Sequence, residues 1–378
     1  MPNRQRRTPA APAVAVLGAV LLVGLPAAPA SATGASRVSA RLSANGVHPG
    51  APVIVTGRAT PGAGRVVSLQ LRGGSGWATV RSTRTGRSGS YSLPVTSTWT
   101  GSISYRVHLA RAGAAAGADS PGFTFTVTGR GSSRDVTYLS GSSTSPARWD
   151  PCRTIGYRVN TTLATSGALS DVLGAMARVN RVSGLHLTYR GSTRIVPTGR
   201  NGGSYPVDTD IVVAWVRPGQ TAAIASNARQ IGTGGASWRS WRVNGRTYRR
   251  MDTGMVLLST RSNTLAGGFG AGPTTGWLGT RGQLLMHEIA HAAGVNHARG
   301  PSQVMYPVMT RKPAAFGAGD AAGLRKVGRA SGCFPASLTR ALSVARPDAL
   351  STSQPGAPVP GLPAALRTAP TAGAAVAG

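Results

Sequence analysis

Alternation of apolar and polar residues is the dominant pattern between residues 36 and 129. Short runs with a period of two are separated by turns rich in glycine, proline and serine, which is the pattern of strands with one buried face. The expected strands are 37–44, 51–58, 65–72, 76–84, 89–96, 102–110 and 122–128. This part of the chain is therefore predicted to form an all-β domain.

The pattern changes in residues 149–335, where strands and helices are mixed. Leu169, Val172, Met176 and Val179 recur at helical spacing and predict a helix over 167–181. Further strands are expected at 155–160, 185–189, 211–216, 235–241 and 255–259, and further helices at 281–293 and 320–329. This order predicts a second domain of the α+β class, so the chain is expected to be multi-domain.

Three other segments have the composition of processing or connecting regions. Residues 1–32 contain a basic start, an apolar stretch and a small-residue cleavage site, which is typical of a secretory signal peptide. An uncleaved membrane anchor is the alternative, although Pro26 and Pro29 interrupt the apolar run. Residues 130–148 are expected to be a linker, and the Ala/Pro-rich residues 336–378 a disordered tail. The sequence thus predicts a secreted protein without stable membrane insertion.

Basic residues greatly outnumber acidic residues. The chain has 41 lysines and arginines against 10 aspartates and glutamates, a formal net charge of +31, and the excess extends over both domains. A diffuse positive field favours loose association with polyanions, for example anionic cell-wall polymers. No motif for a specific nucleic acid is present.

Cys152 and Cys333 are the only two cysteines. An even number in an exported chain predicts one disulfide, which would join the two ends of the second domain. Two buried free thiols are the alternative.

The strongest chemical signal is a run of histidines around the single glutamate, Glu288. His287 and His291 lie four residues apart, so both imidazoles share one helical face and can bind one zinc ion, with Glu288 beside them as general base. Gly294 can end the helix in the left-handed conformation, which allows the chain to turn back and deliver His297 as a third ligand. Three protein ligands leave one zinc position for water, as in catalytic sites.

The sequence His287-Glu288-x-x-His291-x-x-Gly294-x-x-His297 resembles the metzincin signature. Met305, followed by tyrosine and proline, is similar to the Met-turn of the matrixin branch, in which the methionine lies beneath the zinc ligands; Met309 is a weaker candidate. The resemblance implies a metzincin domain at 149–335 with a mixed, twisted sheet and three helices. The domain at 36–129 resembles small immunoglobulin-like sandwich modules that accompany exported bacterial enzymes.

By this resemblance, the expected function is that of a secreted zinc metalloendopeptidase with protein or peptide substrates. The resemblance also implies that an extended substrate adds to the edge strand near 235–242. Two alternatives are a basic cell-surface or wall-binding protein that retains a zinc site, and a zinc hydrolase of cell-wall peptides. A structural calcium ion at Asp208 and Asp210 is possible but has no support in the local sequence, where acidic residues are sparse.

Overall fold

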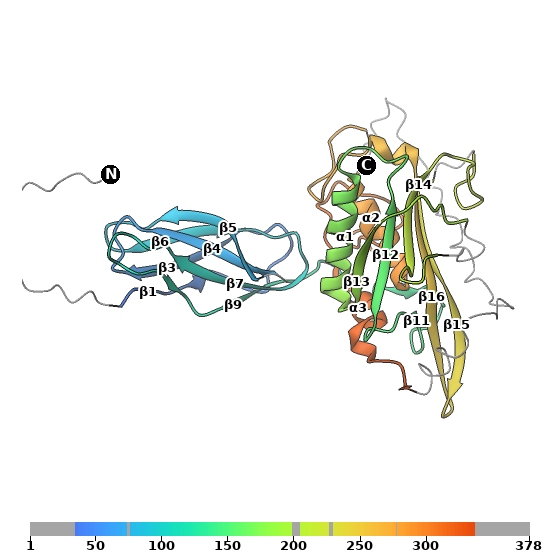
Figure 1. Ribbon diagram of the computed structural model, residues 1–378, viewed down its shortest axis with the longest axis horizontal. Helices are drawn as coiled ribbons and strands as arrows, with labels where there is room; N and C mark the ends of the chain where they lie inside the picture. The colour runs from blue at the N-terminus through green and yellow to red at the C-terminus, as the bar shows by residue number, and fades with distance from the viewer. Residues whose placement is uncertain (1–34, 74–75, 199–204, 227–229, 277, 337–378) are drawn as a thin grey trace, which may run out of the picture.

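The computed structural model describes residues 35–336 except 74–75, 199–204, 227–229 and 277 (Figure 1). The predicted signal peptide at 1–32 and all but the first residue of the tail predicted at 336–378 lie outside the described residues. Over these described residues the chain forms two units that are rich in β-structure, and the second unit also contains three α-helices.

The first unit consists of two antiparallel sheets that enclose one hydrophobic core. One sheet contains β1 (Arg37–Val38), β2 (Arg41–Leu42), β3 (Val53–Thr60) and β6 (Ser90–Val95). The other contains β4 (Val66–Gly73), β5 (Gly76–Arg84), β7 (Gly101–Leu109), β8 (Ala118–Asp119) and β9 (Phe123–Val127). Val55 and Leu93 from the first sheet meet Leu69 and Val107 from the second, and all four side chains are buried. The alternating pattern therefore specifies a two-sheet sandwich.

The expected strand at 37–44 is divided into β1 and β2, although both pieces pair with β3. Between them, the Ser39 hydroxyl accepts a hydrogen bond from the Arg58 N–H at 3.1 Å. The Ser39 side chain thus accepts the hydrogen bond from Arg58 that a backbone carbonyl would accept in a regular ladder, and the strand is interrupted at this point. The other strands expected in this unit occur within a few residues of their predicted bounds, and β8 is an additional short strand.

The second unit is built on one six-stranded mixed sheet. Its strands are β11 (Ala147–Arg148), β12 (Thr154–Asn160), β13 (His186–Ser192), β14 (Ile211–Val216), β15 (Gly232–Val243) and β16 (Arg246–Ser259). All neighbouring pairs are parallel except β15 and β16, and the antiparallel β15 pairs only with β16. The edge strand expected near 235–242 is therefore part of β15.

Three helices, α1 (Ala168–Ser183), α2 (Arg281–Ala293) and α3 (Ala318–Val327), pack on one face of this sheet (Figure 1). On the opposite face, Ile224 packs against Ala214, Val216 and Leu257. Because both faces are covered, all six residues of β14 are buried, which explains its continuous apolar sequence. Two short 3-10 helices, η1 (Thr260–Thr264) and η2 (Arg329–Ser331), follow β16 and α3.

The segment 130–148 is not a free linker, contrary to the prediction. Its strand β10 (Thr137–Tyr138) pairs with β17 (Val295–Asn296), and β11 pairs with β16. Val136, Tyr138 and Leu139 also pack against the core of the second unit. The second unit therefore begins before residue 149. The sequence did not indicate this because the segment is short, lies among glycines and serines, and pairs with residues far along the chain.

The two units are in direct contact through the loop between β6 and β7. The Arg178 guanidinium lies 4.3 Å from the Trp99 ring and 3.6 Å from the Phe269 ring, and burial lowers its pKa to about 10. Thr100 donates to the Phe316 carbonyl at 2.6 Å, and Arg181 donates to the Ser102 carbonyl at 2.9 Å. These contacts hold residues 99–102 of the first unit against α1 and the segment before α3.

Cys152 and Cys333 form a disulfide, with their Cα atoms 5.5 Å apart. The bond joins the segment between β11 and β12 to the residues that follow η2, so it holds the two ends of the second unit together. None of the helices that the structure describes has the length and apolar character needed to cross a membrane.

Replacement of both Cys152 and Cys333 by serine is expected to lower the free energy of unfolding by up to about 5 kcal/mol. The disulfide spans 181 positions, so its loss restores a large amount of chain entropy to the unfolded state. Urea denaturation of the parent and the double variant measures the difference. Thiol labelling of the unreduced, unfolded parent is expected to detect no free sulfhydryl, and labelling of both cysteines would contradict the pairing.

Candidate metal centre

The helix that carries the histidines begins and ends where the sequence predicts. The Thr280 side chain accepts a hydrogen bond from the Gln283 N–H at 3.2 Å and caps the first turn of α2. Gly294 ends the helix with φ at 113°, and a Cβ at this position would lie 2.6 Å from the Ala147 carbonyl oxygen. Both the left-handed backbone and the lack of space require glycine here. The turn directs residues 295–297 back toward the helix.

His287, His291 and His297 come together as the sequence predicts. Their potential ligand atoms all lie within 4.8 Å of one another. The Nε2 atom of His291 lies 3.1 Å from that of His287 and 3.3 Å from that of His297. Three imidazoles whose Nε2 atoms converge in this way lie close enough to hold one metal ion.

Two backbone carbonyls orient the buried histidine rings. His287 Nδ1 lies 2.8 Å from the Val304 carbonyl oxygen, and His291 Nδ1 lies 2.9 Å from the Val295 carbonyl oxygen. A carbonyl can only accept, so each Nδ1 carries the proton and each neutral ring has its Nε2 lone pair free. Burial lowers the pKa of His287 to about 3, and it also lowers the pKa of His291 and His297. The rings are therefore held in the neutral form that binds metals.

Glu288 lies beside the histidines and is only 1% exposed. Neither carboxylate oxygen makes a hydrogen bond of normal geometry to a described residue, although the Gly234 N–H lies near enough to favour the charged form. Burial raises the pKa of Glu288 to about 8, and the neighbouring Gly234 amide offsets only part of this effect. A buried carboxylate without a partner is costly, and such groups commonly belong to sites that bind a further ion or water.

Strand β15 passes directly over Glu288, and two glycines make this approach possible. A Cβ on Gly232 would lie 2.7 Å from the Glu288 carboxylate, and a Cβ on Gly234 would lie 1.9 Å from the Glu288 carbonyl oxygen. The sequence analysis did not single out these residues. Their alternation within a strand is the signal, because glycine in a strand often marks a close backbone approach.

Asp320 holds the backbone loop that contacts His287. Its buried carboxylate accepts hydrogen bonds from the N–H groups of Val304 at 2.5 Å, Met305 at 3.1 Å and Gly317 at 2.9 Å. The Val304 carbonyl in turn orients His287. Burial raises the pKa of Asp320 to about 6, while the three N–H groups lower it in smaller part. The sequence signal was the single acidic residue of the helix, which lies in its first turn.

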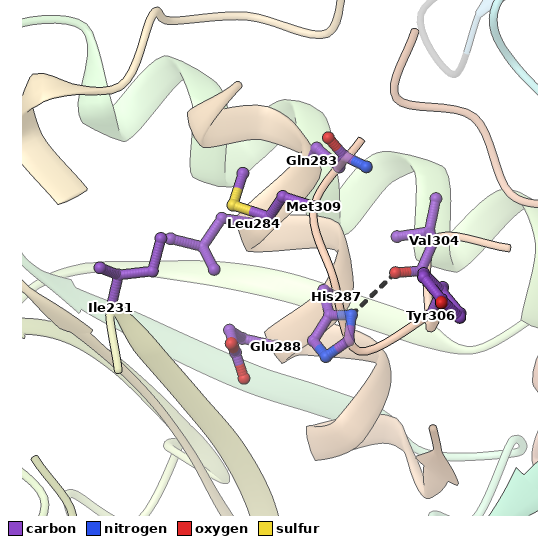
Figure 2. Close-up of a pocket in the computed structure, with 8 residues that line it drawn as sticks. All are labelled: Ile231, Gln283, Leu284, His287, Glu288, Val304, Tyr306 and Met309. Carbon is purple, nitrogen blue, oxygen red and sulfur yellow. Dashed lines mark hydrogen bonds between the residues drawn. The ribbon is translucent and has the colours of Figure 1, made fainter. Parts of the chain in front are cut away.

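Met305 is fully buried, and its carbonyl accepts from the Ala298 N–H at 2.9 Å, next to the third histidine. A small hollow adjoins the centre (Figure 2). His287 and Glu288 lie on one side of it, and Ile231, Leu284 and Met309 provide apolar walls. Apolar side chains therefore lie next to the histidines.

Asp208 and Asp210 do not form a metal cluster. Asp208 makes an ion pair with Arg158 at 3.0 Å, and Asp210 accepts from the Gly156 N–H at 2.7 Å. The three histidines are the only group of at least three potential ligands in the described part of the chain. The possible calcium site at Asp208 and Asp210 thus gains no support from the structure.

No protein-family model matches this chain, and no curated protein is detectably similar to it in sequence. The residues themselves are therefore what indicates a metal. Three neutral imidazoles converge beside a buried, unpartnered carboxylate, and this donor set fits a divalent ion with a position left for water.

The metal-free protein is expected to lose stability when the pH rises from about 6.5 to about 9. The pKa of Glu288 is raised to about 8 by folding, so its contribution is fully present below its unfolded value of 4.5 and is lost as pH rises through 8. In Glu288→Gln this alkaline loss should disappear, and at pH 9 the variant should have an unfolding equilibrium constant at least about tenfold smaller than the parent.

Chemical denaturation of the chelated proteins across this pH range provides the measurement. Below pH 6.5 both proteins should lose stability as the pH falls, because the pKa values of the three histidines are lowered on folding and the unfolded chain gains protons first. The parent should lose less than the variant down to about pH 4.5, because protonation of Glu288 favours its folded state. Parallel alkaline curves for parent and variant would show that Glu288 is not the responsible group.

Asp320→Asn is expected to reduce the free energy of unfolding by about 1–3 kcal/mol, because its amide nitrogen cannot accept from the buried N–H groups. Asp119→Asn is the matched control, since Asp119 is exposed and pairs with Arg106 at the surface. Urea denaturation of both variants tests the difference. Equal effects would argue against a supporting role for Asp320.

Proposed function

We propose that this protein is a secreted zinc-dependent endopeptidase. The observation that carries the proposal is the isolation of Glu288, whose two carboxylate oxygens have no described partner although the side chain is buried beside three histidines. The other described buried carboxylates of the second unit bind backbone N–H groups or an arginine, as Asp150, Asp171 and Asp320 do. Glu288 is therefore the one buried acid that remains available for chemistry.

Zinc is the metal that best fits the donor set. Three imidazole nitrogens with one open position are the usual catalytic arrangement for this ion. Zinc bound there would lower the pKa of a coordinated water to about 7 and polarise the carbonyl of a substrate.

Each surrounding group then has a defined role in peptide hydrolysis. Glu288 accepts the proton from the attacking water and passes it to the leaving amine. The carbonyls of Val304 and Val295 keep the proton of His287 and His291 on Nδ1. The free edge of β15 passes over Glu288 and can hold an extended peptide by adding it as a strand. The apolar side chains beside His287 would contact one substrate side chain.

Several further features support the same assignment. The spacing of His287, Glu288, His291, Gly294 and His297, with Met305 behind them, resembles the metzincins and their matrixin branch. The first unit would then be an immunoglobulin-like module attached to the enzyme. The disulfide supports export, because such bonds form in oxidising compartments. The positive charge favours retention near anionic cell-wall polymers.

The test is cleavage of a peptide library by the purified exported chain, together with the metal content of the same samples. The parent should bind about one zinc ion per chain and cleave peptides, and a chelator should abolish the cleavage. Cleavage confined to cell-wall peptides would identify a wall hydrolase, and bound zinc without any cleavage would favour a binding protein. A parent without stoichiometric metal would refute the proposal.

Glu288→Gln should retain zinc but lose roughly two to four orders of magnitude in turnover, because the ligands remain and the base is removed. His291→Ala should lose both metal and activity, since two ligands hold zinc poorly. His186→Ala is the matched control, because His186 is exposed on β13. If Glu288→Gln cleaves peptides as fast as the parent, Glu288 is not the base.

A further inference from the structure

The third histidine differs from the other two in how the protein fixes it. His287 and His291 belong to α2, and a backbone carbonyl orients each ring. His297 lies beyond the helix and is less buried than its partners. Its backbone makes hydrogen bonds to Thr137 and Asn296, and its ring lies beside the rings of His287 and His291.

These backbone contacts come in part from the segment that joins the two units. The Thr137 hydroxyl donates to the His297 carbonyl at 2.7 Å. On the other side, the His297 N–H donates to the Asn296 side chain at 2.8 Å. Thr137 thus reaches the third ligand from 160 positions earlier in the chain.

The same segment also holds the backbone that orients His291. Thr137 and Tyr138 pair with Asn296 and Val295 in the two-stranded sheet of β10 and β17. The Leu139 N–H donates to the Gly294 carbonyl at 3.1 Å. The backbone of Val295, whose carbonyl accepts from His291, is therefore held by β10 at Val295 and by Leu139 at the preceding residue.

The segment 136–139 can hold the backbone near the histidines because its own side chains are packed against the second unit. Val136 packs so close to α3 that a Cβ on Gly323 would lie 2.5 Å from its methyl group. Tyr138 and Leu139 pack against the core of the second unit. The position of Thr137 is consequently determined by packing that does not involve the histidines.

We propose that Thr137 is a positioning residue for the metal, and that β10 sets the place of the third ligand through the backbone of residues 294–297. The inference rests on the metal site of the proposed function and not on peptide hydrolysis. Hydrogen-bonding groups that orient ligands typically change metal affinity when they are removed.

The experiment compares Thr137→Val with Thr137→Ser in the full chain. Valine keeps the shape of threonine and removes the donor, whereas serine keeps the donor. Thr144→Val is the matched control, because Thr144 lies in the same segment, is exposed and has its side-chain hydroxyl hydrogen-bonded to Ser142 rather than to the site. Competition with a chromophoric chelator gives the dissociation constant for Zn²⁺, and the absorption spectrum of the Co²⁺ form reports the ligand geometry.

Thr137→Val is expected to bind Zn²⁺ about tenfold more weakly and to show an altered Co²⁺ spectrum. Thr137→Ser and Thr144→Val should match the parent in both measurements. Thermal unfolding of the metal-free proteins is measured in parallel, and the midpoints should agree. If Thr137→Val fails to fold, Thr137→Ala, which also lacks the donor, takes its place in the comparison.

Two results would overturn the inference: a dissociation constant of Thr137→Val equal to that of the parent, or a loss that Thr144→Val shares. A parent that binds no metal would instead refute the proposed function. A parent that binds zinc but cleaves no peptide would leave the role of Thr137 intact.

Discussion

Complete burial of α2 is the constraint on which the rest of the structure depends. All thirteen residues of the helix are buried, including His287, Glu288 and His291. Polar side chains can be buried only where other groups compensate for the loss of water. The sheet, the other two helices, β15 and the loop at residues 304–309 therefore surround one helix, and each contributes backbone or apolar side chains to it.

The few acidic residues of a very basic chain are used mainly inside the second unit. Asp171 binds the Arg281 side chain at 2.7 Å and the Gly268 N–H at 3.0 Å, and so fixes the start of α2. Asp320 holds the loop whose carbonyl orients His287. Glu288 has no such structural task, and this contrast distinguishes the acid of the candidate site from the acids that support the fold.

The contact between the two units also involves α2, the helix that carries His287 and His291. Trp99 and Thr100 of the first unit line a small crevice together with Met286, the residue before His287, and with Phe316. The segment after β9 then continues over α3 and pairs beside the third histidine. The first unit is consequently attached to the scaffold of the metal centre at two places.

The sequence alone determined the features that depend on local interactions. The bounds 281–293 of α2 agree with the structure, because the Thr280 cap and the left-handed Gly294 act within one turn of the helix. The spacing of His287, His291 and His297 likewise requires only helical geometry and one turn. The strands of the sandwich and most strands of the second unit followed from periodicity, and the pairing of Cys152 with Cys333 followed from their number.

Only the tertiary structure decided which distant groups surround the site. The pairing of β10 with β17, the bonds of Asp320 and the passage of Gly232 and Gly234 over Glu288 join residues far apart in the chain. Such contacts depend on how the helices pack on the sheet, and no local pattern encodes this packing. The same holds for the isolation of Glu288, because a residue's lack of partners is known only when all its neighbours are in place.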